Sequence, residues 1–72
     1  MEVSSTKPKR VLLPGFFDML NPGHISYILQ AKQLFESTYL IIGIVKDESV
    51  PTAMTFHERF ENMKHVKLVD EV

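Results

Sequence analysis

The chain has 72 residues, of which 44% are hydrophobic and 24% charged, and its formal net charge is -1. This length allows at most one small domain, and the composition is that of a globular protein rather than a disordered one. The near-neutral charge gives no support for a nucleic-acid partner or an anionic membrane surface, and the absence of cysteine excludes disulfides and thiolate metal sites.

No stretch of the sequence is apolar for long enough to span a bilayer, since the longest such run covers only residues 39–45. The first ten residues are polar and lack the apolar core of a secretory signal. Together with the absence of cysteine, these features fit a reducing compartment, and we expect a cytoplasmic protein.

Residues 1–9 are polar, with a Lys-Pro-Lys centre, and are expected to form a flexible N-terminal lead-in to a domain over residues 10–72. A basic tag is the alternative interpretation of this segment. Residues 10–14 form a short run closed by Pro14 and Gly15, which predicts a first strand. Residues 22–35 carry apolar side chains at helical spacing, which predicts a helix. These side chains belong to Ile25, Ile28, Leu29, Ala31, Leu34 and Phe35.

Residues 39–45 form a continuous apolar run, which predicts a strand buried on both faces in a parallel sheet covered by helices. After a loop at residues 49–54, Thr55 and Glu58 fit a capping box that opens a second helix, and residues 66–72 are a candidate third strand. This β-α-β-α-β order predicts an α/β fold, the first half of a Rossmann-like doubly wound parallel sheet. The first strand would lack a neighbour on its far side, so we expect either a fragment or a homo-oligomer, such as a dimer, that closes the sheet by association.

The loop between the first strand and the first helix has the features of a phosphate site. Asn21 is a good N-cap, and Pro22 suits the first helical position. A helix N-terminus directly after a strand offers free N–H groups and a partial positive charge, which suit a phosphate. Gly23 leaves room for a ligand near the backbone, and His24 adds an imidazole that can donate a hydrogen bond.

Several blocks of the sequence resemble the nucleotidyltransferases that carry an H-x-G-H or T-x-G-H signature, and most closely the CTP:phosphocholine and CTP:phosphoethanolamine cytidylyltransferases. The resemblance covers residues 10–72, and its blocks come in the family's order. The blocks are residues 15–18 with Gly23 and His24, residues 30–35, residues 38–44 with Asp47 and Glu48, the pair Glu58 and Arg59, and residues 69–72.

The resemblance implies transfer of CMP from CTP to phosphocholine or phosphoethanolamine in phospholipid biosynthesis, with release of pyrophosphate and usually with Mg²⁺. It implies that the backbone at Phe16 and Phe17 contacts CTP, that Asp18 helps to set the loop, and that His24 contacts the phosphates and stabilises the transition state. The implied catalytic residues are His24 and Asn21, and no side chain is implied as a metal ligand. The implied CTP-binding residues are Gly15, Phe16, Phe17, Asp18, Gly23, His24 and Arg59.

The chain departs from the family's pattern at several points. Asn21 stands at the first motif histidine, so one possible cation is lost. The loop at residues 49–57 is shorter and lacks the lysine that normally faces the triphosphate, and Lys46 is no obvious replacement. Lys67 stands where an arginine is usual and cannot form the bidentate fork. The family's later Arg-Thr-Glu-Gly-Ile-Ser segment, which forms the second wall of the CTP site, is not among these 72 residues.

Each candidate residue also has a simpler structural interpretation. Asn21 can be a plain cap, Gly15 and Gly23 can be turn residues, and Asp18 can accept hydrogen bonds from backbone N–H groups. Arg59 is either a phosphate contact or part of an ion pair on a helix surface.

The two remaining histidines, His57 and His65, are expected to be solvated helix residues. For the chain as a whole, two alternatives to catalysis remain. One is a truncated or degenerate nucleotide-binding or assembly module without activity, and the other is a structural fragment that binds nothing.

Overall fold

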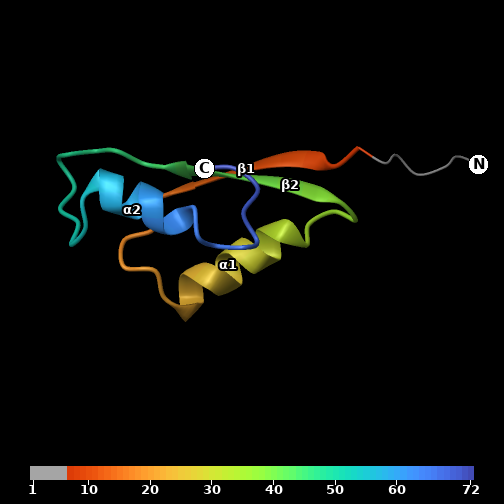
Figure 1. Cartoon of the computed structure of the whole chain (residues 1–72), viewed down its shortest axis with the longest axis horizontal. Helices are drawn as coiled ribbons and strands as arrows, with labels where there is room; N and C mark the ends of the chain where they lie inside the picture. The colour runs from red at the N-terminus through yellow and green to blue at the C-terminus, as the bar shows by residue number, and fades with distance from the viewer. Residues whose placement is uncertain (1–6) are drawn as a thin grey trace, which may run out of the picture.

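The structure is a computed structural model that describes residues 7–72. Its elements follow one another as strand β1 (Lys9–Gly15), helix α1 (Pro22–Lys32), strand β2 (Thr38–Ile44) and helix α2 (Phe56–Met63), as Figure 1 shows. The two strands are parallel and are joined through α1. The α/β fold predicted from the sequence is therefore confirmed, as a Rossmann-like half with a two-stranded parallel sheet.

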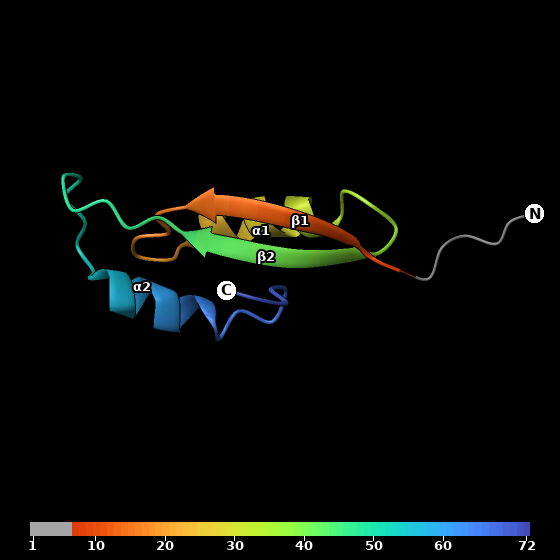
Figure 2. The same ribbon diagram turned by 90° about the horizontal axis from the view of Figure 1, so that it is seen from above.

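The pairing of β1 with β2 runs from Lys9 opposite Thr38 to Gly15 opposite Ile44. Helix α1 packs beneath this sheet, and α2 lies along the outer side of β2 (Figures 1 and 2). Because both strands run in the same direction, their carboxyl ends meet at one edge, and the loops that lead into α1 and α2 leave from that edge (Figure 2).

The hydrophobic core lies between the sheet and the two helices. Alternate residues of β2, Leu40 and Ile42, are completely buried or nearly so, because successive strand residues point to opposite faces. Helix α1 and helix α2 each contribute side chains to the same cluster. Its buried members are Phe17, Ile28, Ala31, Leu40, Ile42 and Met63.

The opposite face of the sheet is not covered by either helix, because both lie on the same side (Figure 1). Leu12 of β1 is 64% exposed, and Tyr39 and Ile41 of β2 are only half-buried. The expectation that helices cover both faces of the second strand is therefore wrong for the described residues. The continuous apolar run of β2 reflects its parallel pairing with β1. It does not indicate a second layer of helices on the opposite face of the sheet.

Helix α1 ends at Lys32, three residues before the predicted end at Phe35. Its last turn tightens, since Leu34 N donates to Ala31 O at 3.3 Å, and the chain then bends back toward β2. Leu34 and Phe35 consequently lie outside the helix and are 63% and 47% exposed. The predicted apolar face is thus narrower than expected, with Ile28 and Ala31 as its buried members.

The predicted third strand over residues 66–72 is wrong, apart from one parallel bridge between Glu71 and Ile41. Turn hydrogen bonds occupy the preceding residues, where Val69 N donates to Val66 O at 3.1 Å. At the bridge, Ile42 N donates to Glu71 O at 2.8 Å. The segment therefore touches the free side of β2 without forming a ladder along it.

Each strand begins one residue earlier than predicted, and β1 starts at Lys9, a residue that the sequence places in the lead-in. Lys9 N donates to Ser37 O at 2.9 Å, which ties this residue to the start of β2. The rest of the predicted lead-in falls largely on residues 1–6, outside the described residues. Within residues 7–72, neither helix is long and apolar enough to cross a membrane.

Candidate functional site

The candidate site lies at the carboxyl ends of β1 and β2, where parallel α/β sheets bind their ligands. Residues 16–21 lead from β1 into α1, and residues 45–55 lead from β2 into α2. Each helix therefore begins at this edge, with its unpaired backbone N–H groups and the positive end of its dipole.

The N-terminus of α1 is capped by Asn21, as predicted. Its Oδ1 accepts a hydrogen bond from His24 N at 3.1 Å, and its Nδ2 donates to Met19 O at 3.4 Å. Pro22 occupies the first helical position, and the first turn contains no acidic residue. The positive end of the α1 dipole is therefore not neutralised by a side chain of its own turn.

His24 lies in that first turn, with its ring held edge-on against Phe17. The two ring centroids are 5.7 Å apart, and the planes meet at 63°. The Nδ1 atom of His24 is buried and has no hydrogen-bond partner among residues 7–72. Contact with Phe17, rather than a carboxylate, thus fixes the orientation of the imidazole.

The backbone before α1 is strained at two residues, Phe17 with φ 51° and Met19 with φ 54°. Such angles are costly for residues with a side chain and persist only where the surroundings enforce them. Phe17 is 5% exposed, and a Cβ atom on Gly15 would lie 2.8 Å from its ring. Gly15 is thus required by the packing of Phe17, whereas a Cβ atom on Gly23 would lie 3.1 Å from the capping atom Asn21 Oδ1.

Asp18 connects the two loops of the site. Its Oδ2 accepts from Ala53 N at 2.7 Å and its Oδ1 accepts from Met54 N at 3.0 Å. Asp18 was expected to set its own loop, but the N–H groups that it binds belong to the loop before α2, far away in the sequence. Local turn chemistry predicted the role of acceptor and could not identify the donors.

Arg59 of α2 is a buried residue, with only 4% of its surface exposed. Its Nη1 donates to Phe16 O at 3.0 Å and to Val45 O at 2.9 Å, and its Nε donates to Met54 O at 3.3 Å. One guanidinium therefore holds the residues that follow both strands. The interpretation of Arg59 as an ion pair on a helix surface is wrong.

The sequence profile of the cytidylyltransferase-like family matches residues 12–72. This chain belongs to that family. Choline-phosphate cytidylyltransferase 2 of Arabidopsis thaliana is 45% identical to it over 74 residues, which cover 96% of this chain and 24% of that protein.

Two further relatives show the same likeness. Choline-phosphate cytidylyltransferase A of Rattus norvegicus is 41% identical over 71 residues, which cover 92% of this chain and 19% of that protein. Ethanolamine-phosphate cytidylyltransferase of Arabidopsis thaliana is 41% identical over 71 residues, 92% of this chain and 16% of that protein. The chain therefore spans a quarter or less of the length of these curated relatives.

In this cytidylyltransferase-like chain, the residues predicted for the site come together from both halves of the described structure. Arg59 reaches the loop of the glycine and histidine motif through Phe16 O. His57 and His65 are exposed, as expected, although His65 lies in the turn after the end of α2 rather than in a helix. Lys46, which on sequence grounds is no obvious replacement for the family's loop lysine, lies in the same hollow as Arg59. The available signal was its position immediately beyond a parallel strand.

A metal centre made by the protein alone is not present in residues 7–72, where no three His, Cys, Asp or Glu side chains cluster. Both carboxylate oxygens of Asp18 are used by backbone N–H groups. Magnesium in nucleotide sites is commonly held by substrate phosphates with one or two carboxylates.

Proposed function

We propose that this protein transfers CMP from CTP to phosphocholine or phosphoethanolamine and releases pyrophosphate. The observation that carries this proposal is the position of His24 at the uncharged first turn of α1, at the carboxyl end of β1. A chain of this family with such a corner is suited to receive the phosphates of a nucleotide. The names of the relatives supply the two phosphorylated acceptors.

In the proposed reaction, a phosphate oxygen of the acceptor attacks the α-phosphorus of CTP, and the bond from that phosphorus to the bridging oxygen of the β-phosphate breaks. The electron pair of that bond leaves with pyrophosphate. The protein's task is to position the reactants and to neutralise charge. His24 and the N–H groups of the first turn of α1 would hold phosphate oxygens, and Asn21 would fix the backbone of His24 through the cap.

Other residues would act on the nucleotide through the backbone. The loop at Phe16 and the strained Phe17 would present its peptide groups to CTP, and Gly15 and Gly23 would add no side chains of their own at this corner. Asp18 and Arg59 would hold this loop in place. We propose that Mg²⁺ accompanies CTP, where it would neutralise phosphate charge, and that the protein works in the cytoplasm.

The experiment that tests this function is an assay of the 72-residue chain with CTP and each acceptor, with the cytidine product separated and measured. Replacing His24 by alanine should lower the rate by roughly 10²–10³, the usual effect of losing one such electrostatic donor. The matched control is His57→Ala, because His57 is exposed on α2 and has no role in the proposal. Near-normal turnover of His24→Ala would exclude the proposed role.

Titration of the same proteins with CTP separates catalysis from binding. Turnover that depends on His24 supports the enzyme. Binding of CTP without turnover would instead support a nucleotide-binding module, and the absence of both would leave a structural role.

We also propose that the chain associates with itself. Within residues 7–72, the outer edge of β1 has no strand beside it, and Leu12 of that strand is 64% exposed. Apolar strands with an unpaired edge favour pairing with another chain. Sedimentation at micromolar concentration should show dimers or larger species, and a homogeneous monomer would contradict the proposal.

A further inference from the structure

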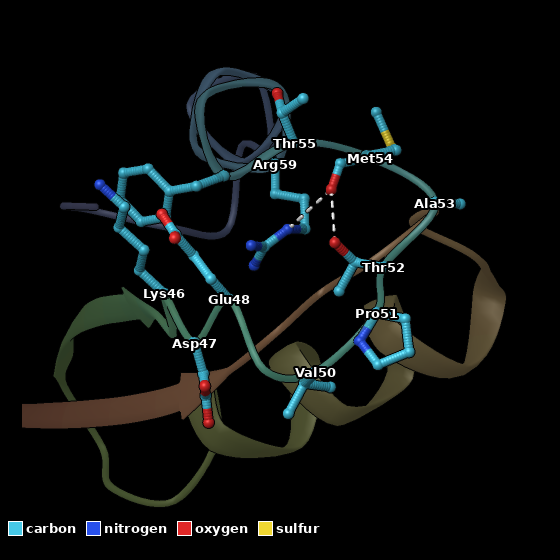
Figure 3. Close-up of a pocket in the computed structure, with 11 residues that line it drawn as sticks. Lys46, Asp47, Glu48, Val50, Pro51, Thr52, Ala53, Met54, Thr55 and Arg59 are labelled. Atoms are coloured by element: carbon cyan, nitrogen blue, oxygen red, sulfur yellow. Dashed lines mark hydrogen bonds between the residues drawn. The ribbon is translucent and has the colours of Figure 1, made fainter.

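A hollow of about 360 Å³ lies between the segment that follows β2 and the start of α2. This volume is at the lower end of the range for small-molecule sites. Its lining includes two cations: Arg59 reaches into the hollow from α2, and Lys46 runs along one margin from the segment after β2, as Figure 3 shows. Nothing in the proposed reaction has so far used Lys46.

Arg59 presents one unused group to this hollow. Its Nε and Nη1 are bonded to carbonyl oxygens, whereas Nη2 has no hydrogen-bond partner among residues 7–72. The one buried side-chain nitrogen or oxygen without a partner in these residues is His24 Nδ1, so Nη2 is open to solvent. Figure 3 shows the terminal nitrogens of Arg59 directed across the hollow toward the side formed by Lys46 and Glu48. An otherwise buried guanidinium thus keeps one donor for a ligand.

Lys46 supplies the second cation. Its Nζ is 5.4 Å from the centre of the Phe56 ring, and Arg59 Cζ is 5.9 Å from the same centre. Among the described residues, neither cation has a carboxylate oxygen within the 4.0 Å of an ion pair. Two positive groups near one ring, neither of them in an ion pair, favour the binding of an anion that both can reach.

The two carboxylates that line the hollow, those of Asp47 and Glu48, differ in their hydrogen bonds. Asp47 accepts from Ser49 Oγ at 2.7 Å and from Ser49 N at 3.0 Å. These two hydrogen bonds lower the pKa of Asp47, and its side chain points away from Arg59 (Figure 3). Glu48 lines the hollow without an ion pair in the described residues. The negative charge of Glu48 would repel a bound anion. Removing this charge should therefore strengthen anion binding, whereas removing the charge of Lys46 should weaken it.

We propose that this hollow is a phosphate subsite, in which Lys46 Nζ and Arg59 Nη2 bind the oxygens of a phosphate group. The proposal deepens the proposed function and rests on it for the source of the phosphate, which is either the triphosphate of CTP or the phosphomonoester of the acceptor. Asp18 fastens this loop to the α1 corner through Ala53 and Met54, so both phosphate-binding surfaces belong to one continuous site.

The test is titration of the isotope-labelled 72-residue chain with inorganic pyrophosphate, CTP and phosphocholine in separate NMR experiments without magnesium. Pyrophosphate should shift the amides of residues 46–55 and the Nε–H of Arg59. Lys46→Met should weaken pyrophosphate binding about tenfold, the effect of losing one charge-assisted hydrogen bond. Glu48→Gln should strengthen it severalfold, because a repelling charge is removed.

Lys64→Met is the matched control, since Lys64 Nζ also lies near a phenylalanine ring, 5.1 Å from the centre of Phe60, but outside the hollow. Unchanged binding in this variant shows that position, not total charge, matters. An equal loss in Lys46→Met and Lys64→Met, or no loss in Lys46→Met, would overturn the subsite. An effect of Lys46→Met on CTP alone assigns the triphosphate, and an effect on phosphocholine alone assigns the acceptor.

This outcome is independent of catalysis. Pyrophosphate binding that depends on Lys46 would stand even if the chain transferred no CMP. Conversely, turnover that depends on His24 but not on Lys46 would uphold the proposed function and refute the subsite.

Discussion

The two helices of this chain begin at the same edge of the sheet, yet their first turns are built for different purposes. At α2, Thr55 Oγ1 accepts from Glu58 N at 3.1 Å, and Glu58 Oε1 accepts from Thr55 N at 2.9 Å. At α1, Asn21 provides the cap, but the residue that corresponds to Glu58 is His24. The first turn of α2 therefore carries a negative charge from Glu58 at the positive end of the helix dipole. The first turn of α1 carries no negative charge at the same place.

This difference separates a helix start that serves structure from the helix start that we propose as a site for an anion. A glutamate at the third helical position neutralises the dipole and satisfies a backbone donor, which stabilises the helix. A histidine at the same position gives up that stabilisation and keeps a hydrogen-bond donor for a ligand. The predictions that follow exchange or remove the residues responsible.

The largest effect is expected for His24→Glu, which gives α1 the first turn of α2. CTP affinity should fall by roughly 10² or more, since a negative charge replaces the donor that we propose for the phosphates. The free energy of unfolding should not fall, and should rise by up to about 1 kcal/mol from the new helix-dipole contact. CTP titration and urea unfolding measure the two quantities, and retained CTP affinity would contradict the assignment of this corner.

Arg59→Met should have the next largest effect, a loss of about 3 kcal/mol in the free energy of unfolding. Three carbonyl oxygens, those of Phe16, Val45 and Met54, would lose a charged donor. Arg59→Lys should lose less, because it keeps the charge but not the fork. Urea unfolding measures the change, Lys64→Met is the exposed control, and a loss below about 0.5 kcal/mol would place Arg59 among ordinary surface residues.

The reciprocal exchange, Glu58→His, should cost about 1 kcal/mol of stability, the usual value of a capping interaction. It should not change CTP affinity, because Glu58 does not line the hollow beside the start of α2 and its carboxylate accepts from Thr55 N. Thermal or urea unfolding and CTP titration give the two values. A gain in CTP affinity would show that a histidine at the start of either helix is enough to bind the nucleotide. The proposed difference between α1 and α2 would then be wrong.

The smallest effect concerns the far end of α1, where Lys32 Nζ pairs with Asp70 Oδ2 and Leu40 N donates to the same oxygen at 2.7 Å. These contacts lower the pKa of Asp70. A lowered folded-state pKa contributes stability above the unfolded-state pKa of about 3.9, and this contribution is lost as the pH falls through the lower folded value. Asp70→Asn should therefore flatten the loss of stability below about pH 4, measured by urea unfolding across that range. If Asp70→Asn lost stability at low pH as steeply as the unchanged protein, groups other than Asp70 would be responsible for the acid sensitivity.

Local features of the fold were predictable from the sequence because their causes are local. The cap at Asn21 and the capping box of Thr55 and Glu58 each depend on residues three positions apart, and both were confirmed. The order of strands and helices followed from hydrophobic periodicity, and the family followed from the motif around Gly23 and His24. The roles of the residues in this motif remain predictions until a ligand is bound.

The errors arose where distant segments decide the outcome. Leu34 and Phe35 fit the helical period, but the short return to β2 ends α1 before them. Arg59 has a role set by carbonyl groups of Phe16 and Val45, and no pattern around Arg59 specifies those partners. Residues 66–72 have the composition of a strand, yet turns leave a single bridge at Glu71.

Asp18 has a consequence for the entropy of ligand binding. Its two hydrogen bonds join the loop before α1 to the loop before α2, and Phe17 and Met19 are already held at positive φ. Ordering such a loop on association would oppose binding, since each immobilised residue loses conformational freedom. In this chain that ordering takes place when the protein folds, so a nucleotide would meet a surface that is preorganised before it arrives.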